Sequence, residues 1–448
     1  MKNNIITRIA PSPTGLFHLG TARTALFNYL FAKQHQGKFI FRLDDTDRER
    51  SRPEYVDDIA EAMSWLGLTA DETYRQSEHQ ALYRAKLEEL LAQDKIYWSQ
   101  EEIKEAGDRT TVLRFRNPNR LISFRDLVRG DIEFATADLG DFVVAKDLDT
   151  PLYHFASVAD DLQSEITHVI RGEDHISNTP RQILLIEALG GERPLYAHLP
   201  IIMAPDKSKL SKRKHGELAA ISAYRRQGYL PEAVINFIAL LGWSPQSGQT
   251  EDRNEEVLTL PDLLAKFDLT KVGKSGASLH LDKLNWLNRV YLKRLPAQEL
   301  KRQVLSFLPA EFTKEVWYDE AMLVKILPLI LDRLDRLDQV TALAQAGELT
   351  YFFRRPEPTA VQLKTPASLA ATAELIAAIP EEDFTHETVR AAVWPRAEAV
   401  GKGQVLWPLR VALTGLDKSP DPFTVAAVLG KTETLARLLY AQKITLPT

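Results

Sequence analysis

The chain contains no cysteine among its 448 residues. This absence excludes disulfide bonds, thiolate-bound zinc and a cysteine nucleophile. Long apolar runs are also missing: residues 326–331 read ILPLIL, whereas a membrane helix needs roughly 18 apolar residues in succession. The first residues lack the apolar stretch of a signal peptide, so we expect a cytoplasmic protein with no membrane partner.

An excess of positive charge is missing as well, since the formal net charge is −5. This value argues against a general polyanion-binding protein. Basic residues are instead concentrated locally: residues 109–129 hold six arginines and one aspartate, and residues 207–214 hold five cations and no acid. Local patches of this kind can form a nucleic-acid surface on an acidic protein.

The remaining composition is that of an ordinary globular protein, with 44% apolar and 26% charged residues. The chain length predicts about two to four domains with sizeable cores.

The N-terminal segment has the pattern of a strand, a helix and a second strand. Residues 5–10 read as a buried strand, and Thr21 is the expected cap of a helix over residues 22–35. Apolar residues recur in that helix at the spacing of one buried face. Residues 39–43 form the next expected strand and end in the acidic sequence DDTD. A strand–helix–strand unit with short turns predicts a doubly wound parallel sheet, which binds ligands at the carboxyl ends of its strands.

The same pattern resumes after a long interval. We expect strands at 141–146 and 166–171 and helices starting at 153 and 179. Residues 76–149 therefore read as an insertion in the sheet domain. Residues 246–256 are polar and read as a surface loop, and the chain beyond about 290 reads as helical, with one helical face formed by Leu323, Ile326, Leu327, Ile330, Leu334 and Leu337. The predicted fold is α/β: a Rossmann-type domain with an inserted α+β domain, followed by a mostly α-helical region.

A short motif follows the first strand. His18 and Gly20 open the expected helix directly after a Pro-Ser-Pro-Thr-Gly turn that includes Ser12 and Gly15. The N–H groups and the dipole of a helix N-terminus favour phosphate, and a residue without a Cβ lets a flat base approach the backbone. A capped helix start with a surface histidine is the competing interpretation of this motif.

A cationic loop lies near the middle of the chain. Lys209, Ser211, Lys212 and Arg213 follow the apolar segment 199–203, which would direct the loop toward the strand ends. Cations on such a loop can stabilise the charge that moves onto departing pyrophosphate. A solvated run of charge is the alternative.

Together these segments resemble the HIGH and KMSKS signatures of class I aminoacyl-tRNA synthetases. The wider sequence resembles bacterial glutamyl-tRNA synthetases through 8–20, 41–47, 74–77, 153–156, 166–174, 209–214, 281–288, 403–415 and 429–431. The resemblance implies two halves of a catalytic domain at 1–75 and 150–205, an inserted acceptor-end-binding domain at 76–149, a stem-contact region at 206–290 and a helical anticodon-binding region at 291–448.

The resemblance assigns roles to individual residues. It implies catalytic roles for His18, Lys209 and Lys212, and ATP binding by these three together with Gly15, Gly20, Ser211 and Arg213. The glutamate-binding positions that it implies are Arg8, Ser12, Asp44, Tyr153, Ser157 and Arg171. Strand-end arginines suit this substrate on chemical grounds, because guanidinium pairs with carboxylate and a neutral glutamine would leave buried charge uncompensated.

Two positions depart from the family pattern. Asp44 stands where the family usually has glutamate, and one methylene less would lengthen its contact with the α-amino group of the substrate. Ser157 stands where asparagine is common. The zinc-binding cysteines of some relatives are absent, so we expect a compact, zinc-free insertion, with Mg²⁺ entering only with ATP.

The nucleic-acid partner would be tRNA. Arg114 and Arg116, with phenylalanines interleaved, suit a single-stranded RNA end, and the resemblance makes Arg333 a candidate for anticodon reading. An ordinary solvated hairpin is the competing interpretation for the insertion. We expect no stable protein partner, and the family suggests a monomer.

The function implied is charging of tRNA(Glu) with glutamate through a glutamyl-adenylate, transfer to the 2′-hydroxyl of the terminal adenosine, and activation that depends on bound tRNA. A tRNA(Gln)-specific or non-discriminating enzyme shares every catalytic motif and stays open. A glutaminyl enzyme fits Arg171 less well, a glutamyl-queuosine enzyme should lack the C-terminal region, and a catalytically inactive tRNA-binding homologue should have lost His18 or the lysine loop.

Overall fold

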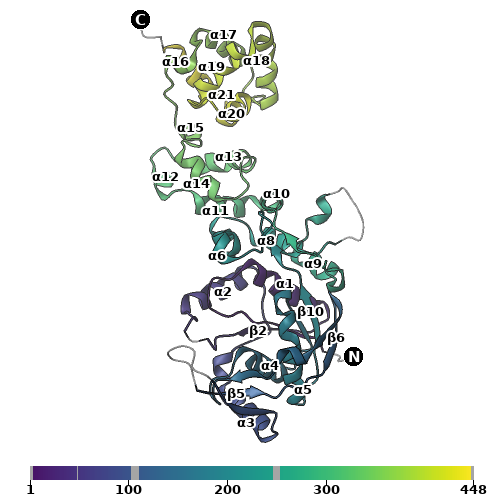
Figure 1. Ribbon diagram of the computed structural model, residues 1–448. Coiled ribbons are helices and arrows are strands. Elements are labelled where there is room, and N and C mark those ends of the chain that lie inside the picture. Colours follow the sequence, from purple (N-terminus) through teal and green to yellow (C-terminus); the bar gives the residue numbers. More distant parts are fainter. Residues whose placement is uncertain (1–3, 48, 102–109, 246–252, 445–448) are drawn as a thin grey trace. The chain divides into compact units, whose positions relative to one another are not determined.

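The computed structural model describes residues 4–47, 49–101, 110–245 and 253–444, without the side chains of residues 212, 253 and 254. The chain divides into two compact units, Met1–Asn288 and Arg289–Thr448. Within the described residues, all β-strands belong to the first unit and the second is helical (Figure 1). The finer domain limits stay predictions. Most of the expected loop at 246–256 lies outside the described residues, and Arg253–Glu256 form a 3₁₀ turn.

Three parallel strands open the first unit. They pair in the order β1–β2–β3 and span Ile6–Ile9, Lys38–Leu43 and Glu72–Arg75. Helix α1 (Leu19–Gln34) connects β1 to β2, and α2 (Pro53–Trp65) connects β2 to β3. This is the strand–helix–strand opening that the sequence predicts.

A second sheet continues beside the first. Its order is β7–β6–β10–β9, and the strands span Gly130–Ala135, Leu121–Asp126, Leu195–Leu199 and His168–Gly172. Only β7 runs antiparallel to its neighbour. Thr167 joins the sheets, because Ile6 N donates to Thr167 Oγ1 (2.8 Å) and Thr167 N donates to Ile6 O (3.0 Å). The carboxyl ends of β1 and β9 therefore lie at one edge.

A third, antiparallel sheet comes from within residues 76–149. It has the order β4–β5–β8 and spans Ile96–Gln100, Thr111–Phe115 and Phe142–Ala145. The strand expected at 141–146 exists, but the expectation that it belongs to the parallel sheet is wrong. It pairs antiparallel with β5, and Leu113 and Ala145 are buried together with α3 (Gln80–Ala92) in one core.

The start of α1 also differs from the prediction. The helix begins at Leu19, and His18 rather than Thr21 is its cap, because His18 Nδ1 accepts a hydrogen bond from Gly20 N at 3.0 Å. The imidazole satisfies one of the N–H groups that a helix start leaves without an intrahelical partner.

The other helices of the first unit flank the sheets. Helix α4 follows β8 and α5 follows β9, as expected from the sequence. A short parallel pair, β11 (Ile202–Met203) with β12 (Ala277–Ser278), lies beside the cationic loop. The helices are α4 (Tyr153–Gln163), α5 (Thr179–Ala188), α6 (Lys212–His215), α7 (Ile221–Arg226), α8 (Pro231–Ala239), α9 (Leu260–Lys266) and α10 (Leu281–Arg294), whose last residues enter the second unit.

The second unit consists of short helices around buried leucines and valines. The single helical face expected over 323–337 is wrong in extent, since α13 ends at Leu331 and Leu334 and Leu337 are buried from the turn that follows. The helices are α11 (Ala297–Phe307), α12 (Ala310–Lys314), α13 (Glu320–Leu331), α14 (Asp338–Gln345), α15 (Thr350–Phe353), α16 (Ala360–Leu363), α17 (Leu369–Ala377), α18 (His386–Val400), α19 (Lys402–Thr414), α20 (Pro422–Leu429) and α21 (Lys431–Gln442).

The predicted fold class is confirmed: parallel sheets with connecting helices and an inserted antiparallel sheet precede a helical region. Across the residues that the structure describes, no helix has the length and apolar character needed to cross a bilayer.

Candidate active site

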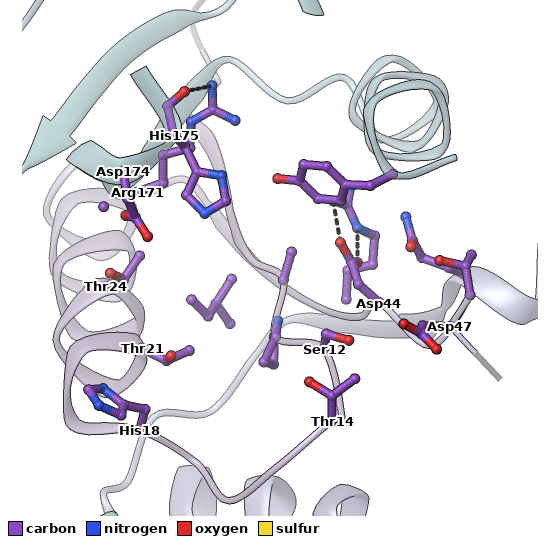
Figure 2. A pocket seen from close by; sticks show the side chains of 18 of the residues that line it. Ser12, Thr14, His18, Thr21, Thr24, Asp44, Asp47, Arg171, Asp174 and His175 are labelled. Carbon is purple, nitrogen blue, oxygen red and sulfur yellow. Dashed lines mark hydrogen bonds and ion pairs between the residues drawn. The ribbon is translucent and has the colours of Figure 1, made fainter. Parts of the chain in front are cut away.

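A cavity of about 1220 Å³ opens where β1 and β9 end. His18 and Gly20 from the N-terminal motif line it together with Lys209 and Leu210 from the cationic loop. Two segments separated by nearly half the chain therefore share one cleft. Figure 2 shows His18, Thr21 and Thr24 along α1 on one side, and Asp44 and Asp47 on the other, with Ser12 and Thr14 between them.

The helix-start side of the cavity is fixed by local hydrogen bonds. Thr14 N donates to Ser12 O (2.9 Å), and Phe17 N donates to Asp58 Oδ2 (2.6 Å), which anchors the turn to α2. Because His18 Nδ1 accepts from Gly20 N, the neutral imidazole carries its proton on Nε2. Gly15 does not belong to the residues that line the cavity.

The cationic loop is anchored at its base. Leu210 N donates to Ile202 O (2.8 Å), while the Lys209 side chain is 56% exposed and its Nζ lies 3.5 Å from Asp174 Oδ2. Ser211 and Arg213 lie outside the described lining of the cavity. Lys212 begins α6, and its side chain falls outside the described part of the chain.

Asp44 belongs to a buried cluster of charged side chains that surrounds Arg42. Arg42 is 0% exposed and donates from Nε to Asp44 Oδ1 (2.6 Å), from Nη1 to Asp161 Oδ1 (2.6 Å) and from Nη2 to Ser157 Oγ (3.1 Å). Burial raises the pKa of Asp44 to about 6, although Arg42 opposes the shift. Ser157 thus lies behind Arg42 rather than in the lining of the cavity.

Arg8 joins the same cluster. Its Nε and Nη2 donate to the two oxygens of Asp161 at 3.1 and 3.2 Å, and only 5% of Arg8 is exposed. Burial opposes the ionisation of Asp161, but Arg8 and Arg42 outweigh it and lower the pKa of this carboxyl. The charge of Arg8 is therefore largely neutralised before any ligand binds.

Arg171 lies across the cavity in a different environment. Its described hydrogen-bond acceptors are all neutral: His198 Nε2 (3.2 Å), Gln182 Oε1 (2.7 Å), Thr179 Oγ1 (2.9 Å) and the carbonyl of His175 (3.4 Å). Among the described residues it forms no ion pair, and burial lowers the pKa of its guanidinium. A buried cation without a carboxylate partner is a strong attractor for an anionic ligand.

Tyr153 and Ser12 complete the predicted amino-acid side. Both line the cavity, and Tyr153 is 39% exposed at the first position of α4. Of the six predicted glutamate-binding residues, the structure therefore brings five to the cavity and leaves Ser157 behind them.

The predicted RNA-binding arginines lie outside the described lining of the cavity. Arg114 of β5 pairs with Glu101 (2.8 Å), and Arg116, just after β5, pairs with Asp94 (3.0 Å). Arg333 pairs with Glu348 in the second unit. Each of the three is held within its own unit by a carboxylate.

Arg42 and Asp161 were not predicted from the sequence as site residues. An arginine inside the apolar strand FIFRL was the available signal, because a charge buried in a sheet requires carboxylate partners. The paired aspartates at 160–161 end an otherwise apolar helical stretch and could have been matched to it.

Comparison with known proteins identifies the family. Residues 4–106 and 97–286 match the model for the catalytic domain of class I tRNA synthetases (E and Q), and residues 299–442 match an anticodon-binding domain. Two glutamate–tRNA ligases are similar over almost the whole chain. That of Desulforamulus reducens is 37% identical, covering 98% of this chain and 100% of its own. Glutamate–tRNA ligase 1 of Rubrobacter xylanophilus is 40% identical, covering 99% of both.

A solved structure agrees with these relatives. The crystal structure of a glutamate tRNA ligase from Elizabethkingia meningosepticum, in complex with its amino acid, has a TM-score of 0.84 to this chain. It is 32% identical and covers 99% of this chain and 100% of its own. This chain therefore belongs to the glutamate–tRNA ligase family of class I tRNA synthetases.

Proposed function

We propose that this chain is a ligase that activates glutamate with ATP and transfers it to the 2′-hydroxyl of the terminal adenosine of tRNA(Glu). One observation carries the proposal. The cavity that His18 and Lys209 share also holds Arg171, a buried cation whose described partners are all neutral. A polyphosphate and an anionic side chain thus both find positive charge in one cleft.

Two displacements make up the reaction. An oxygen of the substrate's α-carboxylate attacks the α-phosphorus of ATP, and the bond from that phosphorus to the bridging oxygen breaks, so pyrophosphate leaves with the electron pair. The 2′-hydroxyl oxygen then attacks the acyl carbon and passes its proton to a phosphate oxygen of the departing AMP, which leaves with the electrons of the acyl–phosphate bond. Neither step needs a covalent bond to the protein, whose task is positioning and charge stabilisation.

The nucleotide would lie along the start of α1. His18 would donate its Nε2 proton to a phosphate, and Gly20, which lines the cavity, would lie against the adenine side of the nucleotide. Lys209 and Lys212 would stabilise the negative charge that develops on the departing pyrophosphate. Gly15 would contribute to the nucleotide site from the turn before α1, and Ser211 and Arg213 from the cationic loop.

The amino acid would lie between Arg171 and Asp44. Arg171 would bind the side-chain carboxylate, and Asp44 with Tyr153 would bind the amino group. Arg8 shares its charge with Asp161, so its expected role is to orient a substrate carboxylate rather than to supply net charge. Ser157 would act through Arg42.

Mg²⁺ would enter with ATP and would supply charge neutralisation at the phosphates. Near the cationic loop the described lining offers Asp174 as a carboxylate, and that carboxylate already faces Lys209. The residues present fit a cation held mainly by phosphate oxygens.

The tRNA would contact several regions. We assign the acceptor end to the insertion at 76–149, including Arg114 and Arg116, the stem to 206–290 and the anticodon to the helical region from 291, including Arg333. Activation would depend on bound tRNA, and the reaction would take place in the cytoplasm.

ATP–pyrophosphate exchange tests the proposal directly. We expect exchange with L-glutamate in the presence of tRNA, and little without it or with L-glutamine. Charging purified tRNA(Glu) and tRNA(Gln) separately then identifies the accepted tRNA. Absence of exchange under all conditions would refute the enzymatic assignment, and charging of tRNA(Gln) alone would refute the stated specificity.

A further inference from the structure

A chain of hydrogen bonds behind Arg171 crosses three neighbouring strands. His198 of β10 is directly opposite Arg171 of β9 in the strand register, and Asp126 ends β6 on the far side of β10. Arg171 Nε lies 3.2 Å from His198 Nε2, and His198 Nδ1 lies 2.6 Å from Asp126 Oδ2. The three residues are 6%, 0% and 2% exposed, so solvent has little access to these bonds.

The two charged neighbours of the His198 ring, Arg171 and Asp126, favour one tautomer. Thr179 Oγ1, 3.2 Å from Nε2, is a hydroxyl that can donate to that nitrogen. A guanidinium can only donate, so His198 Nε2 must accept from Arg171. The proton of the neutral ring then lies on Nδ1 and is donated to Asp126. The opposite tautomer would place two N–H groups 3.2 Å apart and leave an unprotonated Nδ1 against a carboxylate.

Asp126 is itself held in place. Its Oδ1 accepts from the backbone N–H groups of Val128 (2.9 Å) and Arg129 (2.8 Å). Burial opposes its ionisation, but the hydrogen bonds from His198 and the backbone lower the pKa of Asp126. Burial also lowers the pKa of His198 despite the hydrogen bond to Asp126. The pair is therefore a carboxylate beside a neutral imidazole.

We propose that Asp126 and His198 are positioning residues for Arg171: the carboxylate selects the imidazole tautomer, and the imidazole orients the guanidinium without neutralising it. This inference rests on the proposed function, in which Arg171 binds the side-chain carboxylate of glutamate. A carboxylate directly against Arg171 would orient it equally well but would cancel the charge that attracts the substrate. The imidazole of His198 separates Asp126 from Arg171. In contrast, Asp161 contacts Arg8 directly.

A spectroscopic test uses the wild-type protein without substrate. Nitrogen NMR of protein labelled with ¹⁵N-histidine distinguishes the two neutral tautomers, and the His198 signals are assigned by their loss in His198→Gln. We expect the Nδ1–H form. An Nε2–H form, or a doubly protonated ring at neutral pH, would overturn the proposal whether or not glutamate is the substrate.

A kinetic test compares two substitutions of the same residue. His198→Phe keeps a ring but removes the acceptor, and it should raise the KM for glutamate about 10- to 100-fold while leaving the KM for ATP unchanged. The kcat should change little, because Arg171 holds the substrate equally in the ground and transition states. His198→Gln presents an amide oxygen near the position of Nε2 and should restore most of the glutamate affinity.

The matched control is His168→Phe. His168 is a buried histidine of the same strand as Arg171, it contacts Thr167 and Phe31, and it does not line the cavity. The KM values of the His168→Phe variant for glutamate and ATP should stay at wild-type levels. Equal losses for glutamate and ATP in His198→Phe, or an unchanged glutamate KM, would overturn the positioning role.

The two proposals fail in different ways. A wild-type protein that does not charge tRNA with glutamate would refute the proposed function, and the NMR result would still decide the tautomer. A wild-type enzyme with the expected charging activity but the wrong tautomer would refute the positioning role alone.

Discussion

The guanidinium of Arg8 faces the carboxylate of Asp161 in a two-point ion pair, with heavy-atom distances of 3.1 and 3.2 Å. The same carboxylate accepts from Arg42, which also donates to Asp44, so Asp161 is the carboxylate that the two buried arginines share. Asp161→Asn should therefore lower the free energy of unfolding by about 3–5 kcal/mol, because it leaves buried positive charge uncompensated.

Urea unfolding followed by tryptophan fluorescence measures this loss. Asp94→Asn is the matched control, since Asp94 pairs with Arg116 at the surface and is 80% exposed. That substitution should cost less than about 1 kcal/mol. Equal costs for the two variants would show that Asp161 does not hold the cluster together.

Arg171 provides the second prediction. Arg171→Ala should raise the KM for glutamate by about 100-fold while changing the KM for ATP little, because its charge faces the part of the cavity proposed to bind the amino acid. Arg181→Ala removes an arginine of α5 outside the lining and should leave both values near wild type. Aminoacylation kinetics with each substrate varied in turn make the comparison. Parallel losses for glutamate and ATP would contradict the assignment.

The cationic loop provides the third prediction. Lys209→Ala and Lys212→Ala should each slow adenylate formation by about 100- to 1000-fold, since the role proposed for the lysines is to stabilise charge that develops in the transition state. The affinity for tRNA should persist. Lys207→Ala removes an exposed cation of the same loop that does not line the cavity, and it should have little effect. Single-turnover adenylate formation and tRNA filter binding separate the two quantities.

The ionisation of Asp44 predicts that the KM for glutamate depends on pH. The pKa of this carboxyl is raised to about 6, so Asp44 becomes neutral as the pH falls through that value and loses its attraction for an ammonium group. The KM for glutamate should therefore rise below about pH 6. In Asp44→Asn the KM should be high throughout and this part of the pH profile flat. A wild-type profile without the rise would contradict the role of Asp44.

Arg116 tests the RNA-binding assignment. Its guanidinium stacks over Tyr97 at 4.3 Å and its carboxylate partner is largely exposed, so it remains accessible to a phosphate. Arg116→Ala should raise the KM for tRNA several-fold and reduce the slope of affinity against salt by about 1. Glutamate and ATP constants should not change. An unaltered salt slope would remove Arg116 from the tRNA contacts.

Local patterns in the sequence predicted the elements that carry the cavity. The alternation of strand and helix from β1 to β2 and from β9 to α5 can be read from apolar spacing, and strand ends in such sheets collect ligand-binding residues. Arg8, Asp44 and Arg171 could be placed at the cavity on that basis alone.

Partners separated along the chain could not be predicted in the same way. Apolar spacing does not reveal that β8 pairs with β5, or that Asp161 lies against Arg8 at a separation of 153 residues. The predicted N-cap of α1 was wrong for a related reason. The propensity of threonine for helix starts favoured Thr21, whereas the fold turns the His18 ring back onto Gly20 N.

Hairpin β6–β7 has a consequence for protein engineering. It arises between residues 76 and 149, yet β6 is hydrogen-bonded to β10 and supplies Asp126 to the interior of the parallel sheet. Excising that whole stretch to obtain a smaller enzyme would expose the edge of β10 and leave His198 without its acceptor. A working miniature would have to retain this hairpin.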